Sequence, residues 1–331
     1  MKRNRFALYA WAVLGYILLV ILWGAFVRAT GSGAGCGRHW PACNGQIIPR
    51  APATETLIEF THRVTSGFAG VLVVVLLIWA FRAYVKRHPV RRAALLSFIF
   101  IITEGAVGAG LVLLELVGNN DSVARAVWMA AHLINTFFLV AALSLTAWWA
   151  SVLPADEARP ALRLRGQGRS GWLPVIAMAL ILVVSAVGAV TALGDTLFPA
   201  GSLAEGVARD FSPTAHFLER LRVWHPLLAV LSSVYILAAA AFLAEQRPEP
   251  HMRRFARFVQ VMVVVQIVAG VVNLMLLAPV AMQLLHLLLA DLLWIGLVLL
   301  SAVTLAAREP AATADAEPSV ERPVTAPAAS H

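Results

Sequence analysis

Charged residues are scarce in this chain of 331 residues, and that scarcity decides its class. Only 13% of the residues are Asp, Glu, Lys or Arg, whereas 60% are apolar and the mean hydropathy is +0.78. Because charged residues make up about a quarter of a typical soluble domain, the composition excludes a soluble globular protein. It indicates an integral membrane protein that lies in a lipid bilayer.

Acidic residues are also few, 18 against 26 basic ones, but the positive balance does not indicate nucleic-acid binding. The basic residues fall in short clusters between long apolar runs, as they do in the loops of membrane proteins. No nucleic-acid-binding motif accompanies them. We therefore expect no nucleic acid among the partners.

Long apolar runs make up most of the sequence. A spanning helix needs roughly 20 consecutive apolar residues. Eight segments of this kind are expected, at residues 6–27, 58–81, 93–116, 127–149, 172–193, 222–244, 256–277 and 281–305. The predicted fold class is all-α, with these segments as transmembrane helices.

The two halves of the chain resemble one another. GAFVRATG at residues 24–31 ends the first expected helix, and GAVTALG at 188–194 ends the fifth. The third and seventh expected helices each place a polar residue, Glu104 or Gln266, four residues before a glycine. We interpret this as an internal duplication that gives two pseudo-symmetric four-helix bundles.

The domain boundaries follow from this duplication. We expect an N-terminal bundle over residues 1–150, a cytoplasmic linker over 151–171, a C-terminal bundle over 172–306 and a disordered cytoplasmic tail over 307–331. Most of the 26 basic residues lie at the N-terminus, in the even-numbered joints and in the tail. The positive-inside rule therefore predicts a multi-pass protein of the cell (cytoplasmic) membrane with both termini cytoplasmic.

Four histidines lie close to the expected outer ends of the four even-numbered helices. They are His62, His132, His225 and His286. Each is roughly 4 to 8 Å inside the outer boundary at the helical rise of about 1.5 Å per residue. A single histidine there would be interpreted as an interfacial residue bonded to a carbonyl. Because ionisable groups at membrane depth are costly, four at matched depth favour a buried prosthetic group.

Two facing imidazoles per bundle indicate haem more than a bare metal ion. Zinc and copper sites normally need a third or fourth strong ligand, and neither cysteine lies at this depth. A haem needs one histidine from each of two facing helices, which a four-helix bundle offers. Two pairs are compatible with two haems that form an electron path, or with one haem cofactor and one haem-like substrate.

The chain has only two cysteines, Cys36 and Cys43, which flank His39 in the first outer loop. On the oxidising side of a membrane a disulfide is expected, with a metal site that includes His39 as the alternative. The disulfide would either shape a loop over the cofactor cavity or act as a redox-active pair.

Three segments together resemble the haem A synthase family: GAFVRATGSGAGCGRHWPACNG at 24–45, EFTHR at 59–63 and QLLHLLLADLLW at 283–294. The resemblance extends over residues 6–305. It implies a membrane oxidoreductase that oxidises a ring methyl of haem O to a formyl group, giving haem A for terminal cytochrome oxidase. It also implies haem b as cofactor, haem O as substrate, and haem O synthase and cytochrome oxidase assembly factors as partners.

The resemblance implies different roles for the two histidine pairs. His225 and His286 resemble the iron ligands of haem b. His62 and His132 resemble the pair that binds the substrate haem. All four are therefore expected to be metal ligands.

Glu59 is the candidate catalytic residue, because it lies three residues before His62 on the same helix face. We hypothesise that its carboxylate handles protons or stabilises positive charge while the methyl group is oxidised. The alternative is a boundary carboxylate that pairs with Arg63.

The two pockets are expected to differ in charge. Alignment of His62 with His225 sets Glu59 against Arg222. Because a cation suits a carboxylate ligand, Arg220 or Arg222 is predicted to contact a haem propionate.

A membrane electron-transfer cytochrome with two bis-histidine haems is the alternative function. It explains the four histidines but gives no reason for Glu59 or the cysteine loop. A transporter built on repeats would explain the duplication and leave the histidines unexplained. The long joint at 195–220 carries His216, for which the sequence predicts no role.

Overall fold

A computed structural model of the chain describes residues 5–157, 162–164, 166–246 and 249–306. The helices are α1 (Arg5–Ala29), η1 (Ser32–Ala34), α2 (Thr54–Ala83), α3 (Pro89–Leu113), α4 (Val123–Val152), α5 (Gly168–Leu197), α6 (Leu203–Asp210), α7 (Phe217–Arg220), α8 (Trp224–Gln246), α9 (Pro250–Met275) and α10 (Val280–Thr304). Turns join them, and the described residues contain no β-strand. The predicted tail at 307–331 lies outside the described residues.

The predicted all-α membrane fold is confirmed. Within the described residues, 8 helices are long and apolar enough to cross a membrane, if the short α7 is counted with α8 as the span Phe217–Gln246. The chain is a multi-pass membrane protein.

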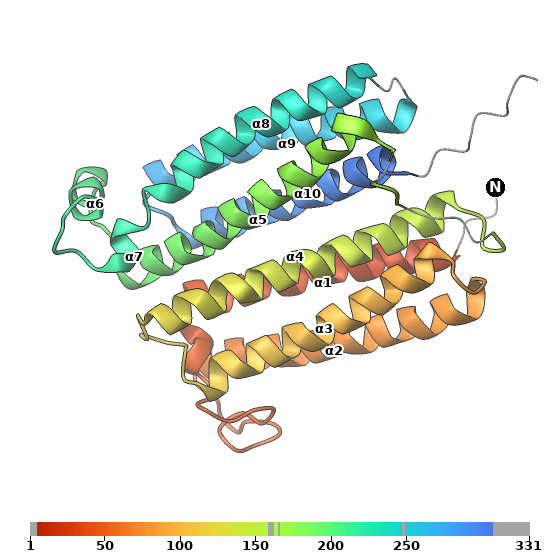
Figure 1. Cartoon of the computed structure of the whole chain (residues 1–331). Helices are drawn as coiled ribbons and strands as arrows, with labels where there is room; N and C mark the ends of the chain where they lie inside the picture. The colour runs from red at the N-terminus through yellow and green to blue at the C-terminus, as the bar shows by residue number, and fades with distance from the viewer. Residues whose placement is uncertain (1–4, 158–161, 165, 247–248, 307–331) are drawn as a thin grey trace, which may run out of the picture.

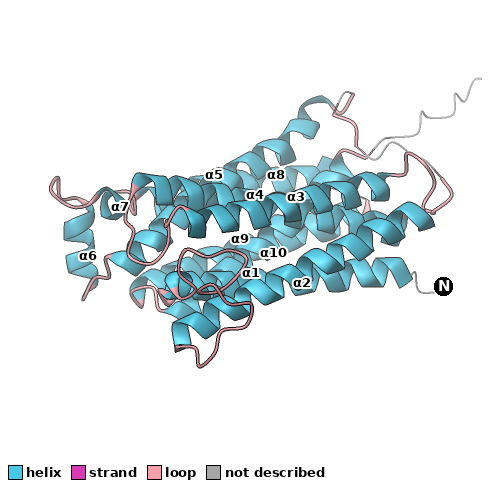
Figure 2. Cartoon of the chain, turned by 90° about the horizontal axis from the view of Figure 1, so that it is seen from below, coloured by secondary structure: helices cyan, strands magenta, loops and turns pink. Residues whose placement is uncertain are grey.

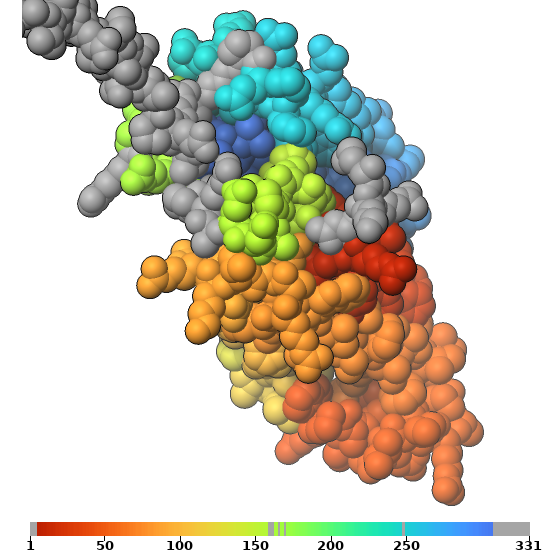
Figure 3. Space-filling model, turned by 90° about the vertical axis from the view of Figure 1, so that its right-hand side faces the viewer, coloured from red at the N-terminus to blue at the C-terminus, as the bar shows by residue number. Residues whose placement is uncertain are grey.

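The spanning helices form two groups of four. α1, α2, α3 and α4 contact one another around the first group, and α5, α8, α9 and α10 around the second (Figure 1). The two groups meet along α1, α4, α5 and α10. The long helices run side by side along the molecule, with α6 and α7 at one end (Figure 2). Seen from the opposite end, the first half of the chain and the second half occupy largely separate parts of the surface (Figure 3).

The core lies where the two groups meet, and α10 is at its centre. Every side chain at residues 293–302 is buried. The Trp294 ring stacks on Phe137 of α4 with ring centroids 5.1 Å apart, and its indole N–H donates to the Phe137 carbonyl at 2.7 Å. Because lipid tails are as apolar as these side chains, close packing and such hydrogen bonds stabilise the contact between the groups.

The predicted starts of the second, third, fourth and fifth helices were four residues too late, and that of the seventh was six residues too late. α3, α5 and α9 begin at Pro89, Gly168 and Pro250. α2 begins at Thr54 and α4 at Val123. The Ser122 side chain accepts a hydrogen bond from the Arg125 N–H at 3.2 Å, so a cap, and not the end of the apolar run, sets the helix start.

The joint at 195–220 is also more regular than expected. It contains α6 and α7, which form at the end of the molecule where the cysteine loop lies (Figure 1). The Ser202 side chain caps α6 by accepting from the Glu205 N–H at 3.2 Å. A search for apolar runs does not detect such short polar helices.

Candidate functional site

The four predicted histidines lie near one end of four different spanning helices. His62 and His132 are in the third turns of α2 and α4, and His286 is in the second turn of α10. His225 is in the first turn of α8, directly after the turn that follows α7. All four histidines therefore lie within the first three turns of their helices.

Each histidine ring packs against a glycine of the preceding spanning helix. At three of these glycines an added Cβ would lie 2.8 to 3.0 Å from the ring Cε1, a separation that only a shift of the ring would relieve, whereas at the fourth it would lie 3.9 Å away. The tight pairs are Gly24 with His62, Gly188 with His225 and Gly270 with His286, and the looser pair is Gly108 with His132. The repeat of this contact supports the predicted duplication.

The second pair has the separation that a shared iron requires. The ring centroids of His225 and His286 are 6.2 Å apart, with ring planes at 85°. With metal–imidazole bonds of about 2.0 Å, two rings on one metal have centres roughly 6 Å apart. His225 Nδ1 lies 3.1 Å from the Val184 carbonyl, which fixes the ring as ligating histidines are usually fixed. Buried Nδ1 of His286 has no hydrogen-bond partner in the described residues. The pair fits a haem.

The first pair also leaves imidazole nitrogens without partners. His62 and His132 are close enough for a charge on one to act on the other. The buried Nδ1 of each lacks a hydrogen bond among the described residues. Glu104 Oε1 is 3.3 Å from His132 Nδ1, within ion-pair distance but without hydrogen-bond alignment. In His132 the Nδ1 atom faces Glu104, so the Nε2 atom is the donor that would face a metal.

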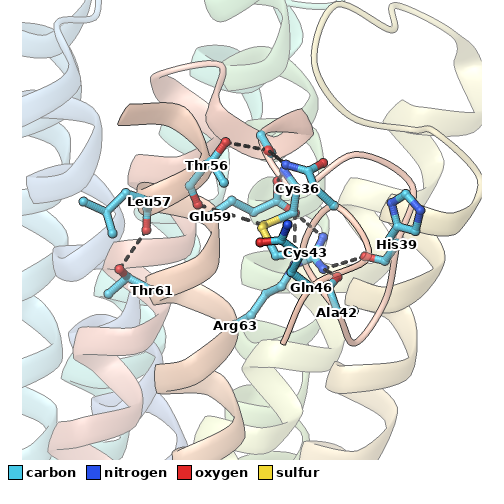
Figure 4. Close-up of a disulfide and its surroundings, with 12 residues drawn as sticks. Cys36, His39, Ala42, Cys43, Gln46, Thr56, Leu57, Glu59, Thr61 and Arg63 are labelled. Atoms are coloured by element: carbon cyan, nitrogen blue, oxygen red, sulfur yellow. Dashed lines mark hydrogen bonds and ion pairs between the residues drawn. A yellow bond between two sulfur atoms is a disulfide. The ribbon is translucent and has the colours of Figure 1, made fainter. Parts of the chain in front are cut away.

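Glu59 is buried beneath the cysteine loop, and its carboxylate bonds to both the loop and Arg63 (Figure 4). Its Oε2 accepts from the Cys36 N–H at 2.8 Å, and its Oε1 accepts from Arg63 Nε at 3.1 Å. Arg63 also donates to the carbonyls of His39 and Ala42, at 2.6 and 2.7 Å. The pairing with Arg63 that the sequence offered as the alternative is thus present.

The predicted disulfide between Cys36 and Cys43 is confirmed, with Cα atoms 4.4 Å apart. The Cys43 and Gln46 backbones hydrogen-bond to each other, and Asn44 N–H donates to the Cys36 carbonyl at 2.9 Å. Thr56 Oγ1 donates to the Gly35 carbonyl at 2.7 Å, which joins the loop to the start of α2. The loop is therefore fastened over the residues that precede His62.

Replacing Arg63 by Ala is expected to loosen this loop and destabilise the protein. The change leaves the carboxylate of Glu59, whose side chain is 4% exposed, without its cation, a loss worth about 3 to 5 kcal/mol for a buried pair. Thermal unfolding in detergent and the rate of disulfide reduction measure the effect. Arg38→Ala is the matched control, because its pair with Glu115 is exposed. Equal behaviour of the two variants would contradict the account of Arg63.

The two arginines predicted to contact a propionate differ in their surroundings. Arg220 is exposed. Arg222 is buried and lies within ion-pair distance of three carboxylates, those of Asp195, Asp210 and Glu219, at 3.1 to 3.3 Å. Burial raises the pKa of the Asp210 carboxyl, and the Arg222 guanidinium opposes that rise. A propionate would have to compete with these carboxylates for Arg222.

His216 acts in the structure as a helix cap. Its Nδ1 accepts from the Leu218 N–H at 3.4 Å, and Glu219 bonds back to the His216 N–H at 3.1 Å, which completes a capping box at α7. Its Nε2 is 3.6 Å from Asp121, in the loop between α3 and α4. His216 therefore links the loops of the two groups.

Sequence reasoning missed two charged residues between the groups. Arg28 donates to the Ala192 carbonyl at 2.6 Å and to Gln283 at 2.7 Å, so it ties α1 to α5 and α10. Asp291 of α10 is fully buried, and neither carboxylate oxygen has a partner in the described residues. A charge inside an apolar segment is the signal that could have singled out both residues.

An open groove of about 710 Å³ runs along α3, and neither histidine of the first pair lines it. α3 lines most of it, with Trp40 of the cysteine loop and Trp128 of α4. Small residues, Gly105, Ala106 and Ala109 among them, leave this space open. Its size suits a ligand of several hundred Å³, and its wall is almost entirely apolar.

Comparison with known proteins decides the family. The family profile described as "Cytochrome oxidase assembly protein" (COX15-CtaA) matches residues 7–298. The chain belongs to this family. The match spans both groups of helices and all four histidines, and the resemblance to haem A synthases found in the sequence is confirmed.

Individual members of the family and their relatives show different extents of similarity. A Thermus thermophilus protein named "Protoheme IX farnesyltransferase" is 52% identical over 298 residues, which is 90% of this chain and 48% of that protein. Proteins named "Heme A synthase" are 46% identical over 96 residues in Geobacillus kaustophilus and 43% over 116 residues in Shouchella clausii. These stretches cover 29% and 35% of this chain, and 30% and 36% of the relatives. The chain thus spans about half the length of the Thermus relative.

Proposed function

We propose that this chain is a haem A synthase, an oxidoreductase that converts a ring methyl of haem O to the formyl group of haem A. The main support is the separation of 6.2 Å between the His225 and His286 rings, together with the equivalent histidines of the first group. Membership in a cytochrome oxidase assembly family and relatives named heme A synthase support the same activity.

We propose that the two histidine pairs have different tasks. His225 and His286 hold haem b, which supplies electron transfer when bound. His62 and His132 hold haem O. With water as the source of the formyl oxygen, oxidation of the methyl group releases four electrons and four protons. An external electron acceptor takes the electrons, and Glu59, one helical turn before His62, takes up protons. The Cys36 N–H and Arg63 orient the Glu59 carboxylate, and the cysteine loop covers it.

The groove along α3 supports haem O as the substrate of the first pair. Haem O carries a long isoprenoid chain, and the apolar wall of the groove suits such a chain. We propose that Gly105, Ala106 and Ala109 leave room for it. Arg222 or Arg220 remains the proposed contact of a propionate on the haem b side.

We propose a place in the cell membrane with both termini in the cytoplasm, from the basic residues of the joints. The proposed partners are haem O synthase and cytochrome oxidase assembly factors. The Thermus relative, whose name describes a farnesyl transfer to protohaem IX and of which this chain matches 48%, supports an association with the enzyme that supplies the substrate.

Expression in a host that makes haem O but lacks its own haem A synthase tests the function. Haem extracted from the membranes, separated and identified by mass, is expected to contain haem A only when this chain is present. Accumulation of haem O alone, with the chain present and carrying haem b, would instead favour the two-haem electron-transfer cytochrome.

A further inference from the structure

In each group of helices a polar side chain lies beside the histidine of the fourth spanning helix. This side chain is a carboxylate in the first group and a neutral amide in the second. Glu104 of α3 lies four residues before Gly108, which packs against His132. Gln266 of α9 lies four residues before Gly270, which packs against His286. The two positions are equivalent in the duplication, and each places its side chain against a proposed iron ligand.

Glu104 is held in place by its neighbours. Its Oε2 accepts from Asn135 Nδ2 at 2.5 Å, and its Oε1 accepts from the Thr136 hydroxyl. The Asn135 amide is itself oriented, because its Oδ1 accepts from Thr103 Oγ1 at 2.6 Å. Within the described residues no lysine or arginine lies within ion-pair distance of Glu104, and its nearest ionisable partner is His132 Nδ1 at 3.3 Å.

Gln266 places a neutral amide beside the His286 ring, at the Nε2 atom, whereas Glu104 faces the Nδ1 atom of His132. Its Nε2 is 3.2 Å from His286 Nε2 and donates to the His286 carbonyl at 3.2 Å. Its buried Oε1 has no hydrogen-bond partner in the described part of the chain. The His286 ring therefore has an amide beside it where the His132 ring has a carboxylate.

We propose that Glu104 is a positioning residue that makes His132 the more electron-donating ligand and lowers the reduction potential of the haem at His62 and His132 below that at His225 and His286. A carboxylate beside the outer edge of a ligating imidazole raises the basicity of that ligand, and its negative charge favours ferric over ferrous iron. The resulting order of potentials favours electron flow from the substrate side to haem b. This inference rests on the proposed function.

Reciprocal substitutions in the full-length protein test it by redox titration. Haem b is added to the purified wild type and to Glu104→Gln and Gln266→Glu variants, and the midpoint potential of each site is read from its absorption bands. H225A/H286A and H62A/H132A backgrounds isolate the first and the second site respectively. A tenfold change in the ferric-to-ferrous ratio, about 59 mV for one electron, is the expected minimum. Glu104→Gln should raise the potential of the first site, and Gln266→Glu should lower that of the second.

Two further variants separate a charge effect from a structural one. Glu104→Asp keeps the charge and should remain closer to the wild type than Glu104→Gln. Glu115→Gln removes a carboxylate that is 60% exposed, so its effect on both potentials should be small. The inference is overturned if haem is bound but the midpoint potentials of the Glu104→Gln and Gln266→Glu variants are unchanged or shift in the opposite directions. If the first site binds no haem b in the H225A/H286A background, the midpoint potential of the second site in the Gln266→Glu variant tests the inference instead. A wild type that binds no haem at either pair contradicts the proposed function instead.

Discussion

Replacing Glu59 by Gln is expected to lower haem A output by at least about 100-fold, the smaller end of the range for a lost proton-transfer group. The amide oxygen of Gln can still accept the Cys36 N–H, now 2.8 Å from the carboxylate, so the cysteine loop should remain closed. Haem b at His225 and His286 should also remain, because both ligands lie in the other group of helices. Haem extraction and disulfide reduction rates measure the two effects separately.

Glu55→Gln is the matched control for this experiment. Glu55 lies one helical turn before Glu59 on α2 but is exposed. Its replacement should leave haem A output unchanged. If Glu59→Gln keeps full output, Glu59 is structural only. If it loses output together with the closed loop, as expected for Arg63→Ala, the loss is explained by the loop and the catalytic role is wrong.

Replacing Gly188 by Ala is expected to reduce the affinity for haem b by about 10- to 100-fold, as changes in groups that orient metal ligands typically do. The added Cβ would lie 2.8 Å from Cε1 and 3.1 Å from Nδ1 of His225, so the ring must move. That movement also disturbs the 3.1 Å contact with the Val184 carbonyl. Haem content per protein and titration of haem b into the apoprotein measure the loss.

Gly67→Ala provides the same chemical change without the steric conflict, because no atom lies within 4 Å of a Cβ added there. Alanine favours a helix over glycine by about 1 kcal/mol, so this variant should fold at least as well as the wild type. Gly188→Ala with normal haem affinity would show that the glycine does not position His225.

The apolar runs alone predicted most of the fold. Segments near the required length for a membrane identified all eight spans. His62, His132, His225 and His286 could be placed at one end because successive spans alternate in direction, so the even-numbered spans that carry them run the same way. The disulfide was predicted from two cysteines in one loop that was expected to face the oxidising side of the membrane. These features depend on local composition and on the alternation of helix direction, which a single sequence contains.

Features that depend on contacts between distant residues could not be predicted in the same way. Two of the carboxylates around Arg222, those of Asp195 in α5 and Asp210 in α6, are distant from it in the sequence, so the sequence near Arg222 does not predict these contacts. Only Glu219 is local, three residues before Arg222. The glycines that receive the histidine rings were visible as a weak repeat, but their contact with the rings appears only when the helices are packed. The sequence did not predict α6 and α7, because these helices are short and polar.

Analysis of the haem extracted from purified wild type, H62A/H132A and H225A/H286A proteins tests the division of labour most directly. The proteins are prepared from a host that makes haem O but has no haem A synthase of its own. The wild type is predicted to carry haem b together with haem O or haem A. H62A/H132A should lose the haem O and haem A while it keeps haem b, and H225A/H286A should lose haem b. Loss of the same haem from both variants would contradict the assignment of one haem to each pair.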